Sequence, residues 1–189
     1  TNNPIEKITF YMPTSEKENI EVNIPGSIIS KLREMNSKLK IELKSDQASF
    51  ELPVDLLDLI EIAHSIEVDI EDIYIQVMME SVSSAVHTNI IEHISSTNIH
   101  LLTHPIDFKL LVGTMDQSIE IKNFGDRFIN RSIAIEGDIQ PERSSVVYYN
   151  TRTNRMHFVP AVFSFENNQW VANFKRNSNS IYTVIHNDK

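Results

Sequence analysis

The stretch from Val146 to Ile185 decides the fold and reads VVYYNTRTNRMHFVPAVFSFENNQWVANFKRNSNSIYTVI. Its short runs rich in Val, Phe, Tyr and Thr are separated by Asn-rich turns, which is the pattern of antiparallel β-hairpins. Asn154 and Asn168 stand at two of these turns, where a hairpin needs the positive φ that Asn tolerates better than most residues. We therefore expect hairpins here, with the apolar run Met156–Phe165 as one arm.

The same stretch lacks the usual signs of catalysis. It carries no nucleophile–base pair, no metal-ligand spacing and no phosphate-binding loop. The residue chemistry of this stretch therefore does not by itself indicate a function.

The composition indicates a folded chain without cysteine chemistry. The 189 residues are 41% hydrophobic with only four glycines, which suffices for one larger domain or two small ones with a packed core. No residue is a cysteine, and this excludes disulfides, thiolate catalysis and cysteine-ligated zinc.

The charge balance disfavours two classes of partner. The net charge of −9 argues against nucleic acid and anionic membranes, since both need clustered Lys and Arg. No apolar run is long enough for a transmembrane helix, so we expect no membrane insertion. The chain starts at Thr1 without a signal-peptide pattern, and we expect it to be a piece of a longer protein.

The first half of the sequence predicts strands mixed with two or three helices. Pro25 precedes the first helix, with Ser27 as its N-cap, and Pro53 precedes the second, with Asp55 as its N-cap. Apolar spacing predicts a third helix over Ser83–Ile94. The expected strands in this half are Ile5–Met12, Asn19–Ile24, Leu39–Leu43, Ala48–Leu52 and Ile73–Met79.

A composition shift near Ile99 divides the chain. Residues 1–98 form an α+β half with strand–Pro–helix units, and residues 99–189 form a β-rich half. No Gly/Ser/Pro-rich linker separates them, so we expect the two halves to pack together. The fold class is α+β, with mostly antiparallel strands. Further strands are expected over Ile106–Val112, Ile119–Phe124 and Arg127–Glu136.

Arg131 is expected to have a structural role. It shares one face of a predicted strand with Ile129, Ile133 and Ile135, which places it in the core. A buried guanidinium needs acceptors, and Asp107 or backbone carbonyls are the candidates.

The histidines do not form a metal-binding pattern. His100 and His104 are four residues apart, but Pro105 and the β pattern deny them a helix face. His87 and His93 are six apart and would not share a face. We therefore expect no stoichiometric metal and no cofactor.

Two weaker motifs are left as alternatives. The acidic segment Glu67–Asp72 offers calcium ligands, but it lacks EF-hand spacing and is typical of a solvated connection. The words His100–Thr103 resemble the His-Leu-Thr cleavage site of self-cleaving adhesion domains, but are one residue too long. Neither motif predicts a catalytic residue.

Aromatic side chains are frequent near the C-terminus. Most of them are expected to fill the core, while strand alternation places some of them outward. An outward set would form a sugar-binding platform, and Trp170 and Tyr182 are the candidate residues for such a surface. The full set is Tyr148, Tyr149, Phe163, Phe165, Trp170, Phe174 and Tyr182.

Short motifs occur in a fixed order along the chain, beginning with Asn23–Pro25 and Ala48–Pro53 and ending with Asn179–Val184. Together they resemble a region that precedes S-layer homology repeats in large exported proteins of Gram-positive Bacillales. The resemblance spans roughly residues 20–185. The repeats themselves are absent from this chain. The motifs are Asn23–Pro25, Ala48–Pro53, Pro105–Lys109, Phe124–Gly125, Phe128–Arg131, Phe158–Ala161 with Pro160, and Asn179–Val184.

The resemblance implies a non-catalytic structural or spacer module of an exported, S-layer-associated protein at the cell wall. The implied partners are neighbouring modules of the same polypeptide and surface-layer proteins. The alternative is a ligand-binding or adhesive module for carbohydrate or protein, acting through exposed aromatics or an open sheet edge.

Overall fold

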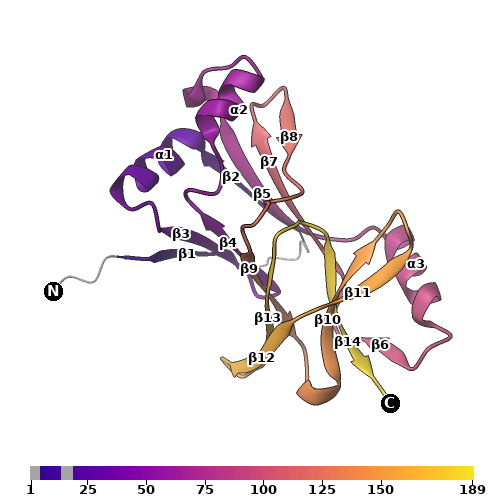
Figure 1. Cartoon of the computed structure of the whole chain (residues 1–189). Helices are drawn as coiled ribbons and strands as arrows, with labels where there is room; N and C mark the ends of the chain where they lie inside the picture. Colours follow the sequence, from indigo (N-terminus) through magenta and orange to yellow (C-terminus); the bar gives the residue numbers. More distant parts are fainter. Residues whose placement is uncertain (1–4, 14–18) are drawn as a thin grey trace.

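The computed structural model describes residues 5–13 and 19–189, and it contains two β-sheets packed face to face (Figure 1). Aromatic rings from the two sheets meet in the middle: Phe50 lies 6.5 Å from Phe108, and Phe174 lies 5.0 Å from Tyr182, between ring centroids. One hydrophobic cluster runs through the inner faces of both sheets. The fold is therefore a β-sandwich with helices added to it.

The first sheet has six strands. All its neighbouring pairs are antiparallel except β1 with β3, which are parallel. The strands, in spatial order, are β1 (Lys7–Tyr11), β3 (Lys40–Lys44), β4 (Ala48–Pro53), β9 (Ile129–Ile135), β13 (Gln169–Arg176) and β12 (Ala161–Glu166).

The second sheet has eight strands, and all its described pairs are antiparallel. Six of them follow in the order β11 (Arg155–Val159), β10 (Ser144–Asn150), β14 (Ile181–Asn187), β7 (Ile106–Gly113), β5 (Tyr74–Ser81) and β2 (Ile20–Pro25). The two short strands are β6 (Ile99–Leu101), which pairs with β14, and β8 (Ser118–Glu120), which pairs with β7.

Three α-helices occur in the described residues. Helices α1 (Gly26–Met35) and α2 (Leu59–Ser65) lie together at one end of the sandwich (Figure 1). Helix α3 (Ser84–Ile94) covers the outer face of the eight-stranded sheet, where its Ile90 packs with Tyr149. Two 3-10 turns complete the list, η1 (Ile70–Asp72) and η2 (Pro141–Arg143).

The predicted class is confirmed at the level of a β-rich chain with three helices and mainly antiparallel strands. The expected boundary near Ile99 marks no break in either sheet. Strand β4 pairs with β9, and strand β5 pairs with β7, so each sheet joins strands from both sides of that position. The division into an α+β half over residues 1–98 and a β-rich half over residues 99–189 stays a prediction.

Both predicted helix N-caps were wrong. Pro25 occupies the N-cap position of α1, and Ser27 lies inside the helix. In α2 the cap is Asp58, whose carboxylate accepts from the Glu61 amide at 3.1 Å. Asp55 lies before the helix and instead accepts from Arg127 at 2.8 Å, because residues 54–57 form a turn before the helix starts.

Two strand predictions also needed correction. The expected strand over Ile119–Phe124 is only three residues long, as β8. The run Met156–Phe165 is not one arm, because Pro160 lies between β11 in the eight-stranded sheet and β12 in the six-stranded sheet. Proline cannot donate to a strand ladder, so the chain changes sheets at this residue.

The predicted turn residues adopt the expected backbone. Asn154 has φ 54° between β10 and β11, and Asn168 has φ 64° between β12 and β13. Asn167 precedes it with φ 49°, so two consecutive left-handed residues close the second hairpin, as a type I′ turn requires.

Candidate functional site

The outer face of the six-stranded sheet forms a polar groove of about 1170 Å³. Alternate residues of a strand point to opposite faces, so the residues between the core positions line this groove. The strand register aligns one residue from each of six strands in a continuous row across the sheet. In spatial order, the row consists of Tyr11, Lys44, Ser49, Ser132, Asn173 and Val162.

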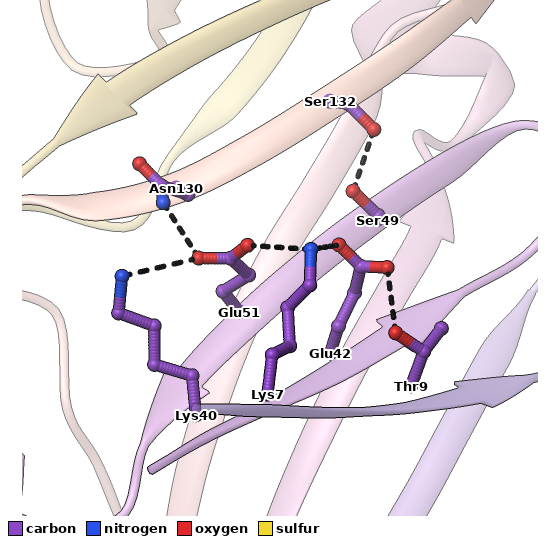
Figure 2. A network of polar contacts seen from close by, with 8 residues as sticks. All are labelled: Lys7, Thr9, Lys40, Glu42, Ser49, Glu51, Asn130 and Ser132. Atoms are coloured by element: carbon purple, nitrogen blue, oxygen red, sulfur yellow. Dashed lines mark hydrogen bonds and ion pairs between the residues drawn. The ribbon is translucent and has the colours of Figure 1, made fainter. Parts of the chain in front are cut away.

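The β1 side of the groove is held by a network of charged side chains (Figure 2). Lys7 Nζ lies 3.1 Å from Glu42 and 3.4 Å from Glu51, and Lys40 Nζ lies 3.8 Å from Glu51. The hydroxyl of Thr9 donates to the other oxygen of Glu42 at 3.1 Å. Lysine side chains therefore neutralise both carboxylates from within the sheet.

The two carboxylates are shielded from solvent, with side-chain exposures of 14% for Glu42 and 13% for Glu51. Burial by itself would lower the pKa of Lys7, but the hydrogen bond to Glu42 and the charges of both carboxylates together raise that pKa above its ordinary value. Lys7 is thus held in the charged form, as a fixed counter-ion rather than a proton donor.

The centre of the groove is lined by uncharged hydrogen-bonding groups. Ser49 Oγ lies 2.5 Å from Ser132 Oγ, across strands β4 and β9 (Figure 2). Asn130 donates to Glu51 at 2.6 Å, and Asn173 donates to Ser164 at 3.0 Å. These contacts fix the side-chain rotamers while leaving each hydroxyl and amide further hydrogen-bonding capacity.

Apolar side chains lie at the margins of the groove. Phe128, just before β9, is 62% exposed, and Val162 on the edge strand β12 is 70% exposed. The groove therefore combines uncharged hydrogen-bonding groups at its centre, paired charges at its β1 side, further charged residues such as Lys44, Lys175 and Glu166, and the exposed ring of Phe128. This arrangement suits reversible binding of a polar ligand.

Arg131 lies on the opposite face of β9, in the core, and is 2% exposed. Its guanidinium donates to the carbonyls of Ile129, Arg176 and Ser178 at 3.1–3.2 Å and to Asn179 Oδ1 at 2.6 Å. Desolvation lowers its pKa to about 10, so the group stays charged at neutral pH. The predicted burial is confirmed, and the structural role follows from these four acceptors.

Aromatic rings surround the same guanidinium. The Arg131 Cζ atom lies 5.2 Å from the centroid of Phe50, 5.5 Å from Tyr182, 5.8 Å from Phe108 and 6.0 Å from Phe124. Rings from both sheets thus share one cation, which adds cation–π attraction to the packing between the sheets.

Asp107 is not a partner of Arg131, contrary to the first of the two predicted alternatives. It lies on β7 and pairs with Lys109 at 3.4 Å, on the outer face of the eight-stranded sheet. The reason is strand alternation, because Phe108 points into the core and its neighbours point away from it. Burial raises the pKa of Asp107, which the Lys109 charge offsets in part.

The predicted aromatic surface is wrong for Tyr182. This side chain is 0% exposed, and its hydroxyl donates to the Ser178 carbonyl at 2.7 Å. Trp170 is half-buried against the core and packs edge-on against Phe165 at 5.4 Å between ring centroids. Of the seven aromatic residues singled out in the sequence, Phe165 alone is classed as exposed.

Four of the seven histidines lie in two pairs that their spacing did not predict. His100 and His186 face each other across β6 and β14 and share Asp188, at 2.5 Å and 3.4 Å. His87 stacks on His104 at 4.8 Å between ring centroids. Within residues 5–13 and 19–189, no group of three or more His, Asp or Glu side chains has the geometry to hold a metal ion.

The three prolines expected to be structural mark ends of strands. Pro25 ends β2 directly before α1, Pro53 ends β4, and Pro160 separates β11 from β12. In the acidic segment, Glu67 has φ 56° and η1 follows, so its carboxylates lie around a turn between α2 and β5.

The groove itself was missed by sequence reasoning. The strand that carries Asn130 and Ser132 was singled out only for its buried residue Arg131, and its outward polar residues were passed over. The alternation of buried and polar residues along β9 indicated that one face of this strand is polar. The groove becomes apparent only when the pairing of β9 with β4 and β13 is known.

The chain matches no protein-family model, and no curated protein or solved structure shows significant similarity to it. The resemblance to a module preceding S-layer homology repeats therefore stays a prediction. Among the described residues, no helix is long and apolar enough to cross a membrane.

Proposed function

We propose that the chain is a non-catalytic structural module that holds neighbouring modules of an exported cell-surface protein at a fixed separation. The observation that carries this proposal is the position of the two ends of the described fold. Strand β1 begins at one side of the sandwich, and β14 ends at the opposite side (Figure 1). A rigid body whose two ends lie on opposite sides keeps the modules attached to those ends apart.

The internal construction supports rigidity. The core is continuous through both sheets, and Arg131 joins carbonyl acceptors from the β9 and β13 strands and from the segment before β14. Such a core resists bending between the two ends, since interiors packed at crystal-like density deform little. The proposed location is the cell wall, and surface-layer proteins are the proposed lateral partners.

The experiment is a pull-down with purified Bacillales cell walls. It compares this chain with a version extended through the modules that follow it in the gene. The acidic chain, with a net charge of −9, should not sediment with walls rich in anionic polymers at low salt, whereas the extended version should. Saturable sedimentation of the isolated chain at micromolar concentration would overturn the passive role.

A second candidate function is ligand binding, and the polar groove favours it. The groove spans every strand of the six-stranded sheet, and two of its carboxylates, Glu42 and Glu51, are paired with Lys7 and Lys40. A spacer alone has no need of an open, ordered polar face. The two functions are compatible, because the groove lies away from the α1 and α2 end of the sandwich and from α3.

A further inference from the structure

The geometry points to a specific class of ligand for the polar groove: an uncharged glycan chain lying across the strands. This inference rests on the second function proposed above, ligand binding, and is independent of the spacer role. It follows from the charge, the hydrogen-bonding chemistry and the length of the row from Tyr11 to Val162.

Charge disfavours polymers of a single sign, because charged side chains of both signs line the groove, among them Lys44, Lys175 and Glu166. Glu42 and Glu51 are paired with Lys7 and Lys40 inside the sheet, so a cationic ligand would have to displace an existing ion pair from each carboxylate. An anionic ligand would meet the overall charge of −9. A neutral ligand avoids both costs.

The floor of the groove matches a hydroxyl-rich ligand. The hydroxyls of Ser49 and Ser132 and the side-chain amide of Asn173 can each donate and accept hydrogen bonds. Sugar hydroxyls have the same dual character, so each contact can be satisfied in either direction. The exposed ring of Phe128 offers an apolar surface against which the C–H face of a sugar can pack.

An extended peptide fits this face less well. Peptides are recognised by sheets mainly through strand addition at an edge, where free backbone groups are available. On the face of a sheet, backbone groups are already bonded within the ladder, and the polar backbone of a peptide would depend on a few side chains. A glycan carries its polar groups on its rings, so it can bind to side chains without hydrogen bonds to the backbone of a strand.

The length of the row sets the size of the ligand. Six strands give five inter-strand steps of about 4.8 Å, or roughly 24 Å across the sheet. A chain of several sugar residues is long enough to contact side chains from β4, β9 and β13 at once. Short oligosaccharides should therefore bind more weakly than longer ones.

The test is a titration of the isotope-labelled chain followed by amide NMR spectra. The probes are chitohexaose and cellohexaose at concentrations up to the millimolar range, beside an oligogalacturonate of the same length and a Ser/Asn-rich peptide. We expect the neutral hexamers to shift the amides of β4, β9 and β13, with an affinity that does not change with salt.

Two groove variants and one matched control locate the site. Asn173→Val and Ser132→Ala should each weaken binding of the neutral hexamers about tenfold, the loss expected for one or two hydrogen bonds. Gln76→Val removes a half-buried amide from the outer face of the other sheet, where Gln76 donates to Glu21 at 2.6 Å, and should leave binding unchanged. Thermal melts of each variant show whether it is folded.

The possible failures are distinguishable. Shifts caused only by the peptide or only by the oligogalacturonate would overturn the glycan inference while leaving a ligand-binding function in place. Binding that Gln76→Val weakens as much as Asn173→Val would place the site elsewhere and overturn the inference. No shift with any probe would overturn both the inference and the ligand-binding function, and it would leave the spacer role untouched.

Discussion

At the scale of single residues, Arg131 organises the interior. It lies in the row of the six-stranded sheet between Phe50 and Phe174, and its guanidinium reaches the ring of Tyr182 from the other sheet. A buried cation without a carboxylate is costly, and here carbonyls, an amide oxygen and aromatic rings offset that cost. The placement of Tyr182 in the core has the same cause, because its ring completes this cage.

Replacing Arg131 should destabilise the fold strongly. Arg131→Ala leaves several buried acceptors without a donor and opens a cavity among the rings. We therefore expect a loss of about 2–4 kcal/mol in the free energy of unfolding. Urea unfolding measures this loss. Arg143→Ala, at an exposed position in η2, is the control and should stay within about 0.5 kcal/mol of the parent. An equally small effect for Arg131→Ala would show that the cage does not hold the sheets together.

Asp107 gives a pH-dependent prediction. Its pKa is raised by burial above the ordinary value of 3.8, so the protonated carboxyl stabilises the fold and this contribution is lost as the pH rises through the folded-state pKa. At neutral pH the ionised form therefore weakens the fold. Asp107→Asn should raise the free energy of unfolding at neutral pH, and its advantage should shrink as the pH falls towards 3.8.

Urea unfolding across this pH range measures the difference between Asp107→Asn and the parent chain. Lys109 keeps its contact with Glu80 at 3.0 Å in the variant, so its charge remains paired. A variant that is less stable at neutral pH and gains on acidification would contradict the direction of the shift.

At the scale of strands and turns, local sequence patterns predicted the elements themselves but not how the strands pair. The two Asn-rich turns and most strands were predicted from alternation and turn chemistry, because both depend on neighbouring residues. Alternation tells which residues share a face, but not which sheet a strand joins. The sequence thus could not reveal that Pro160 sends β11 and β12 to different sheets.

The same limit explains why the groove escaped prediction. Ser49 and Ser132 are 83 residues apart in sequence and meet only because β4 pairs with β9. Lys7 reaches Glu42 and Glu51 because β1 adds to the sheet in parallel beside β3. Each of these side chains looks like an ordinary surface residue until the strand order is known.

The second hairpin turn gives a prediction at this scale. Asn168 has φ 64°, a conformation that costs a β-branched residue much more than Asn or Gly. Asn168→Val should lower the free energy of unfolding by about 1–2 kcal/mol. Asn168→Gly is the matched control and should be neutral or slightly stabilising in the same urea titration. Equal stability of the two variants would mean that the turn relaxes to another type.

At the scale of the whole molecule, the two sheets act as one body. Each sheet takes strands from both sides of residue 98, and the core cluster is shared. Relative movement of the two halves would break the β4–β9 and β5–β7 pairs together. A fixed separation between the two ends of the fold follows from this arrangement, and the proposed spacer role depends on it.

The most direct test of this claim is a distance measurement between the two ends of the fold. The chain has no cysteine, so Ile5→Cys and Lys189→Cys introduce two unique sites for spin labels. Ile5 is 69% exposed, and Lys189 is also exposed, so labels there should not disturb the core. Double electron–electron resonance should give one narrow distribution at a long distance, unchanged when folded neighbouring modules are attached. A broad or divided distribution, or a short distance between the labels, would contradict the account of a rigid spacer.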